Sequence, residues 1–195
     1  ARSWYSSNKG LPKNVRITSL AVYNNVLLAG TFTNGLFLSY DNGQTWNVSN
    51  TGLKNFTIRC FYTSGPTLLV GTNDGIYSSV NEGKSWNAEK HGVQLNAFSS
   101  TNNKILAATN QGVLASKYYG NSWEWVFREG AIYTLGADEK EIYLLDFFGT
   151  VYRSNTTDFN WFKIDEYPPF HSTFKLTPVS SKFLAVSWKG VLKNL

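Results

Sequence analysis

Ser39-Tyr40-Asp41-Asn42-Gly43-Gln44-Thr45-Trp46 is the stretch that decides the fold, and it reads S-x-D-x-G-x-T-W. Asp41 and Asn42 favour a turn because short polar side chains bond to nearby backbone groups, and Gly43 permits a positive φ. Trp46 then carries a large apolar surface back toward a core. The stretch therefore predicts a tight turn between two strands, fixed by a buried indole.

The same stretch recurs along the chain, and we call each copy a box. The later copies are Ser79–Trp86, Ser116–Trp123 and a weaker one, Ser154–Trp161. The pattern resembles the Asp-box, or bacterial neuraminidase repeat, of β-propeller proteins such as photosystem II assembly/stability factor-like and sortilin-like propellers. The residues that we expect to build the boxes and their packing are Ser39, Asp41, Gly43, Thr45, Trp46, Ser79, Asn81, Gly83, Trp86, Gly120, Trp123, Trp161 and Trp4.

Five tryptophans divide the chain into units of similar length. They are Trp4, Trp46, Trp86, Trp123 and Trp161, so successive spacings are 42, 40, 37 and 38 residues. Counting from Trp161 past Leu195 back to Trp4 gives 38 again. Repeats of this length are typical of propellers and solenoids, and a period that closes on itself favours a ring.

Each unit also contains strand-like runs at matching positions. The predicted first strands are Ile17–Ala21, Ile58–Tyr62, Leu95–Ser99, Ile132–Gly136 and Thr173–Thr177. The aligned second strands are Leu27–Thr31, Leu68–Thr72, Ile105–Thr109, Ile142–Asp146 and Phe183–Ser187. Third strands begin at Leu36, Ile76 and Val113, and the box tryptophan is expected to open the fourth.

These repeats predict an all-β, five-bladed β-propeller made of four-stranded antiparallel blades, as a single domain over residues 1–195. The last unit stops after its third strand, Val191–Lys193, and we expect the N-terminal strand Arg2–Tyr5 to complete it. Pairing the two ends in this way hides two strand edges. The alternative fold is an incomplete piece of a larger propeller.

Composition limits the classes of function. Aromatic residues are frequent (Trp 7, Tyr 11, Phe 13) and charged ones make up 16%, which fits a folded β-rich protein. The net charge of +5 is spread out, without the dense Lys/Arg run that nucleic-acid binding usually shows, and no apolar run is long enough to span a membrane. We expect a monomer that binds no cofactor, no metal and no nucleic acid.

The box carboxylate has a structural and a catalytic interpretation. Asp41 is either an acceptor for backbone N–H groups in the turn or a catalytic or metal-binding group. The equivalent positions hold Asn81, Tyr118 and Thr156, a variation that a turn tolerates and a catalytic group does not. The structural role is therefore favoured, and the ring tryptophans are expected to pack between blades.

Candidate catalytic groups are few. Asp-box sialidases have three clustered arginines and a Tyr/Glu nucleophile pair, which cannot be assigned residue by residue to this chain. Glycoside hydrolysis usually needs a carboxylate pair, and none of the predicted first strands contains Asp or Glu. His91 and His171 lie in separate loops, which makes a zinc site improbable. Cys60 is expected to be buried and inert, and Asp146 to bond locally rather than catalyse.

A ligand is expected on the face opposite the boxes, toward blades four and five. The turns between second and third strands become aromatic there, at Phe147, Phe148 and Trp188, and a long loop into blade five carries Tyr167 and His171. Lys189 and Arg128 would favour an acidic partner. The alternative is that these aromatics fill the central shaft.

Three functions remain open at this point. The first is a non-enzymatic, extracytoplasmic (secreted, periplasmic or cell-surface) binding or scaffolding propeller with a protein or glycan ligand. The second is a lectin-type propeller, which would need aromatic and polar groups repeated between blades. The third is a divergent glycoside hydrolase.

Overall fold

The computed structural model describes residues 3, 5–101, 103–117, 119–166, 175–179, 182–187 and 190–193. The secondary structure of these residues consists of strands joined by turns, and it is divided between two compact units, Ala1–Gly92 and Val93–Leu195. The fold is therefore all-β, as the sequence predicts.

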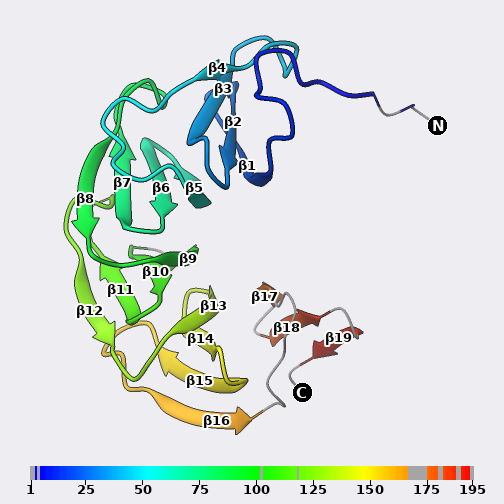
Figure 1. Cartoon of the computed structure of the whole chain (residues 1–195). Helices are drawn as coiled ribbons and strands as arrows, with labels where there is room; N and C mark the ends of the chain where they lie inside the picture. The colour runs from blue at the N-terminus through cyan, green and yellow to red at the C-terminus, as the bar shows by residue number, and fades with distance from the viewer. Residues whose placement is uncertain are drawn as a thin grey trace. The chain divides into compact units, whose positions relative to one another are not determined.

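The first unit contains two four-stranded antiparallel sheets (Figure 1). In each sheet the strands pair in chain order. The first sheet consists of β1 (Ile17–Tyr23), β2 (Val26–Thr31), β3 (Leu36–Ser39) and β4 (Asn47–Val48), and the second of β5 (Ile58–Ser64), β6 (Thr67–Thr72), β7 (Gly75–Ser79) and β8 (Asn87–His91).

The second unit contains two more sheets of this kind and one of three strands. The four-stranded sheets are β9 (Leu95–Ser100), β10 (Ile105–Thr109), β11 (Gly112–Ser116) and β12 (Glu124–Phe127), and then β13 (Ile132–Ala137), β14 (Glu141–Asp146), β15 (Thr150–Asn155) and β16 (Phe162–Glu166). The three-stranded sheet is β17 (Lys175–Val179), β18 (Lys182–Ser187) and β19 (Gly190–Lys193).

Short turns fix the register of the hairpins. In the first sheet Tyr23 pairs with Val26, so that only Asn24 and Asn25 form the turn. Both asparagines have positive φ (46° and 65°), as a two-residue hairpin turn that follows the right-handed twist of its strands requires. Asparagine tolerates this conformation better than most residues, which explains the Asn-Asn pair.

The second strand of each four-stranded sheet lies at the centre of the core. Every residue of β6 and β10 is buried, so these strands show no alternation between buried and exposed positions. In the first unit the core combines side chains of both sheets, such as Leu28, Leu36, Ile58 and Val70. In the second unit Leu106 and Val113 of one sheet pack with Ile132 and Leu144 of the next.

The strand positions follow the prediction with small differences at the ends. The first strand of each sheet begins at or within two residues of its predicted start and extends slightly further. The fourth strands begin one residue after the box tryptophan, because Trp46, Trp86, Trp123 and Trp161 belong to the turn. Arg2 and Trp4, half of the predicted closing strand, lie outside the described residues.

The core predicts a large difference between two aliphatic truncations in the first unit. Leu28 is 0% exposed in β2, whereas Val80 in the second box is 90% exposed. Replacing Leu28 with Ala should lower the free energy of unfolding by about 2–5 kcal/mol, because it removes buried methyl groups and leaves a cavity. Val80→Ala should change it by less than about 0.5 kcal/mol. Urea unfolding of both variants measures the difference, and equal effects would contradict the assigned core.

Candidate functional site

The first box is a turn in which the side chains bond to each other and to the backbone. Asp41 Oδ1 accepts the backbone N–H of Thr45 at 2.8 Å and the hydroxyl of Ser39 at 2.8 Å. Asp41 Oδ2 accepts the hydroxyl of Thr45 at 2.5 Å. Ser39 Oγ in turn accepts the N–H of Gly43 at 2.8 Å, where φ is 87°. The carboxylate is therefore fully used in holding the turn.

The second box repeats this network without a charge. Asn81 Oδ1 accepts the N–H of Ser85 at 2.9 Å and the hydroxyl of Ser79 at 3.0 Å, while Asn81 Nδ2 donates to Ser85 Oγ. Ser79 Oγ accepts the N–H of Gly83 at 2.8 Å. An amide oxygen thus accepts the same bonds as the carboxylate, so this turn also forms without a negative charge.

The third and fourth boxes keep less of the network. In the third, Gly120 N–H still donates to Ser116 Oγ at 3.1 Å. In the fourth, Asn155 Oδ1 accepts the N–H groups of Thr157 and Asp158 instead, which is an Asx turn. Lys104 supports this turn from another strand pair, because its ammonium donates to Thr156 O at 2.7 Å.

Three box tryptophans bond to a backbone segment that lies outside their own box. The indole N–H of Trp46 donates to Ser7 O at 3.0 Å, that of Trp86 to Ser49 O at 3.2 Å, and that of Trp161 to Val126 O at 2.7 Å. Trp123 differs, because its indole N–H donates to Gly120 O within its own box at 2.8 Å. Trp4 lies outside the described residues.

The bonds around Trp46 and Trp86 match one by one. Trp46 N–H donates to Lys9 O and Trp86 N–H to Thr51 O, each at 2.9 Å. Ser7 Oγ donates to Gly43 O, as Ser49 Oγ does to Gly83 O. A Cβ on Gly10 or Gly52 would lie 2.0 Å from the carbonyl oxygen of Trp46 or Trp86, which explains both glycines. We call these two sets of contacts the latches.

The predicted ligand residues of the second unit lie partly in the turn between β14 and β15. Asp146 Oδ1 accepts the N–H groups of Phe148 and Thr150, each at 2.8 Å, so this carboxylate holds the turn. Phe148 is 76% exposed, and Phe147 is 45% exposed with its ring edge-on to Tyr133 at 5.2 Å between centroids. The turn therefore presents aromatic surface from a fixed backbone.

Arg128, which the sequence predicts to favour an acidic partner, directly follows β12. Its guanidinium lies 4.7 Å from the ring centroid of Trp125, in a cation–π contact. Burial raises the pKa of Tyr152, and the nearby carboxylates of Asp146 and Glu129 add to that shift. Asp146 and Glu129 therefore lie near Tyr152.

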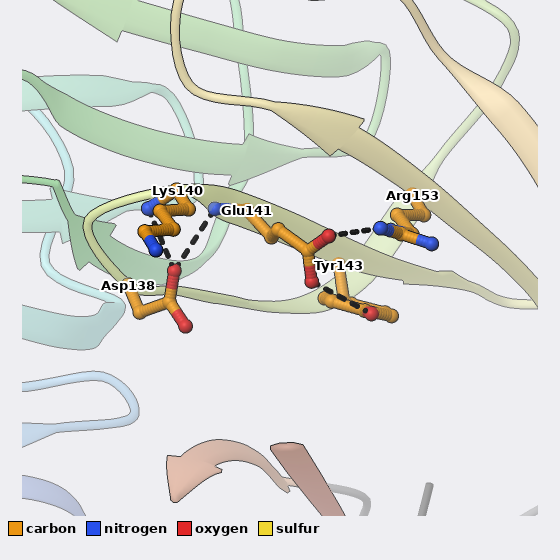
Figure 2. Close-up of polar contacts among 5 residues, drawn as sticks. All are labelled: Asp138, Lys140, Glu141, Tyr143 and Arg153. Carbon is orange, nitrogen blue, oxygen red and sulfur yellow. Dashed lines mark hydrogen bonds and ion pairs between the residues drawn. The ribbon is translucent and has the colours of Figure 1, made fainter. Parts of the chain in front are cut away.

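A polar network connects β14, β15 and the turn that precedes β14 (Figure 2). Glu141 accepts the hydroxyl of Tyr143 at 3.1 Å and pairs with the guanidinium of Arg153. Asp138 Oδ1 accepts the N–H groups of Lys140 and Glu141 at 2.8 and 2.9 Å. Burial raises the pKa of Tyr143, and Glu141 raises it further. The polar groups of these residues bond to one another, which indicates that the network has a structural role.

Four predicted ligand residues lie outside the described residues, namely Tyr167, His171, Trp188 and Lys189. Cys60 is half-buried in β5, and burial raises the pKa of its thiol to about 12. A thiol with such a pKa stays protonated near neutral pH and is a poor nucleophile. Within the described part of the chain, no three His, Cys, Asp or Glu side chains gather as possible metal ligands.

The aromatic residues of the first unit are not among the ligand residues that the sequence predicts. Phe32, in the turn between β2 and β3, is 44% exposed and carries the guanidinium of Arg16 at 4.9 Å from its centroid. Phe56 is 46% exposed. The sequence marks Phe32 only by its position, in the turn equivalent to that of Phe147 and Phe148. It does not mark Phe56, whose position depends on a long-range contact with Gly35.

No protein-family model and no curated protein matches the sequence. Solved structures do match. The extracellular domain of a putative hybrid two component system from B. thetaiotaomicron aligns with a TM-score of 0.75 and 18% identity, over 96% of this chain and 28% of that chain. The extracellular domain of a putative one component system from the same organism gives 0.72 and 14%, over 91% and 26%.

A structure of YCF48 bound to D1 peptide aligns with a TM-score of 0.66 and 14% identity, over 93% of this chain and 64% of that chain. These structures are β-propeller proteins, so the fold of this chain is β-propeller-like. The chain spans about a quarter to two thirds of their lengths. In the part of the chain that the structure describes, none of the secondary structure is an apolar helix of membrane-spanning length.

The first box predicts a pH-dependent stability. Hydrogen bonds from Thr45 and Ser39 lower the pKa of Asp41 from 3.8 to about 2. Because the folded pKa is depressed, the charged form stabilises the fold above pH 3.8, and this contribution is lost as pH falls through about 2. Asp41→Ala should therefore lower the melting temperature at pH 7 more than Asp41→Asn, which keeps an acceptor as Asn81 does.

Thermal unfolding of the wild-type chain and both variants at pH 7, 4 and 2 measures this effect. The difference in melting temperature between wild type and Asp41→Asn should become smaller toward pH 2. A difference in melting temperature that is the same at all three pH values would show that the charge of Asp41 does not stabilise the turn.

Proposed function

We propose that this chain is a non-enzymatic, extracytoplasmic binding or scaffolding propeller. Its residues 1–195 form one five-bladed domain, built from Asp-box repeats and closed by the N-terminal strand. It is a monomer without a cofactor, and a protein or glycan partner docks at the sheet ends opposite the boxes. The observation that carries the binding role is the exposed Phe147–Phe148 turn, which Asp146 holds in place.

The matching latches support closure of the ring. Ser7–Gly10 contacts the first box as Ser49–Gly52 contacts the second, and the two segments are 42 residues apart, as are Trp4 and Trp46. Ser49–Gly52 directly follows β4, the fourth strand of a sheet. By analogy, Ser7–Gly10 follows a fourth strand that contains Trp4, and the three-stranded sheet β17–β19 lacks such a strand among its described residues.

The turn between β14 and β15 supports a binding role because it presents two adjacent exposed aromatic side chains, Phe147 and Phe148, from a fixed backbone. Phe148 exposes most of its surface, while the backbone beneath it is fixed by two hydrogen bonds to Asp146. A rigid aromatic anchor loses little conformational entropy when it binds. Trp188 falls at the equivalent sequence position in the next repeat, and we propose that it joins Phe148 in one platform.

The solved structures support the choice of partner and location. One is a complex with a peptide, and two are extracellular domains. A protein segment as the partner agrees with the peptide complex, and a location outside the cytoplasm agrees with the two extracellular domains.

A carbohydrate is the second candidate ligand, and one observation favours it. Asp146 and Glu129 provide carboxylate oxygens near Tyr152, beside a turn with two exposed phenylalanines. Such acceptors and aromatic faces suit sugar hydroxyls and ring faces. A glycoside hydrolase has less support, because none of the first strands β1, β5, β9, β13 and β17 contains Asp or Glu.

Ring closure predicts a large effect of a short N-terminal deletion. Removing residues 1–6 takes away the proposed closing strand and Trp4 but keeps Ser7–Gly10 and its contacts with the first box. The free energy of unfolding should fall by about 3 kcal/mol or more, as for loss of a buried tryptophan. Trp4→Ala in the complete chain should reproduce most of this loss. Unchanged urea unfolding in both variants would rule out the proposed closure.

The aromatic platform predicts a loss of binding without a loss of stability. Phe148→Ala combined with Trp188→Ala should abolish binding to a native protein partner or to a glycan panel, while the melting temperature stays the same. Tyr40→Ala is the matched control, because Tyr40 is an aromatic residue of the first box and is 52% exposed. A large fall in melting temperature, or binding that persists, would mean that these aromatics are structural.

A further inference from the structure

A hollow opens beside the third box in the second unit. It has a volume of about 290 Å³, and its lining residues are Ala115, Lys117, Ser122, Trp123 and Glu124. We call these five residues the third-box hollow. Ala115 of β11 pairs with Glu124 of β12, and Lys117 follows Ala115 by two residues, so the three side chains share one face of the hairpin. Ala115 precedes the third box as Leu38 precedes the first, and its smaller side chain leaves more space on this face.

The two charged residues of the hollow form an ion pair that the box turn does not require. Lys117 Nζ lies 3.6 Å from Glu124 Oε1. The equivalent two positions hold Tyr40 and Asn47 in the first box, Val80 and Asn87 in the second, and Asn155 and Phe162 in the fourth. None of these combinations carries opposite charges, although the first and second boxes form the complete turn. The ion pair is therefore a feature of the third box and not of the repeat.

Trp123 contributes a fixed aromatic ring to the hollow. Its indole N–H donates to Gly120 O at 2.8 Å, and its ring centroid lies 6.3 Å from that of Phe98. The ring is half-buried, whereas that of Trp86 in the second box is 3% exposed. Because the indole N–H is already bonded within the box, Trp123 offers a ligand its ring surface. A ring that is held in place loses little conformational entropy when a ligand packs on it.

The ion pair places hydrogen-bond donors beside acceptors and leaves the hollow without net charge. The side chains of Lys117 and Glu124 are 58% and 60% exposed. An ammonium has three N–H donors and a carboxylate has two acceptor oxygens, so both groups can bond to a ligand while they stay paired. Ser122, also exposed, adds a hydroxyl. Adjacent hydroxyl groups, which both donate and accept, suit such a surface, and the balanced charge favours a neutral ligand over an ion.

We propose that the third-box hollow binds one pyranose ring of a neutral saccharide. A pyranose combines an apolar C–H face with adjacent hydroxyl groups, and the hollow combines an aromatic ring with a donor and an acceptor. The C–H face packs on Trp123, and neighbouring hydroxyls accept from the ammonium of Lys117 and donate to the carboxylate of Glu124. This site shares no residue with the platform of Phe148 and Trp188, so each of the two can fail without the other.

Titration of the isotope-labelled chain with methyl β-glucopyranoside, followed by proton–nitrogen NMR, tests the proposal. The indole N–H signal of Trp123, identified by its loss in Trp123→Phe, should shift and saturate with a Kd of about 1 mM, as the usual binding energy per atom gives for a ligand of this size. Sorbitol, which has hydroxyl groups but no ring, should bind at least about tenfold more weakly, because it has no rigid C–H face to pack on Trp123.

Substitutions in the hollow and matched controls test whether binding is local. Lys117→Ala and Glu124→Ala should each weaken binding of the glucoside about fivefold or more with an unchanged melting temperature, since both side chains are exposed.

The controls are Lys84→Ala, an exposed cation of the second box, and Phe148→Ala with Trp188→Ala in the platform. Both should leave the affinity for the glucoside unchanged. The proposal would be overturned by the absence of a saturable shift, equal binding of sorbitol, equal losses in the controls, or tighter binding of free leucine, whose two charges would separate the ion pair.

Discussion

The hydrogen bond from a box tryptophan to a backbone carbonyl outside its box is the constraint on which the arrangement of neighbouring sheets depends. A single sheet of this size cannot bury both of its faces, and the first two sheets of the chain share one core. Trp86 closes that core with a side chain that is 3% exposed, and its indole and backbone N–H groups both bond to the segment after β4. Packing and hydrogen bonding thus fix the same contact, with Gly52 leaving the space for it.

This constraint also explains where the chain is free to vary. The side chains of the first two boxes bond within their own turns, so Asp41 in one box and Asn81 in the next hold the same turn. At the other end of β3, the turn that follows β2 carries Phe32 in one sheet, and the corresponding turn after β14 carries Phe147 and Phe148. Recognition can change in these turns without disturbing the contacts between sheets.

The two units differ in the surface that these turns present. In the first, the guanidinium of Arg16 lies over Phe32, whereas in the second Asp146 and Glu129 lie near Tyr152. Likeness to propellers at 14–18% identity establishes the fold and leaves such differences open. The partners of this chain are therefore set by its own surface residues and not by the fold that it shares with these structures.

The sequence by itself determined the strands, the turns and the repeat. Those features depend on contacts between residues a few positions apart: the bonds within Ser39–Thr45 span four residues, and the Asn24-Asn25 turn spans two. Asp146 was correctly expected to bond locally for the same reason. Only the tertiary structure decided that Phe56 lies beside Gly35, that Arg128 stacks on Trp125 and that Trp123 bonds within its own box. Exposure and charge pairing of these side chains are set by segments far away in the sequence, which a local pattern does not encode.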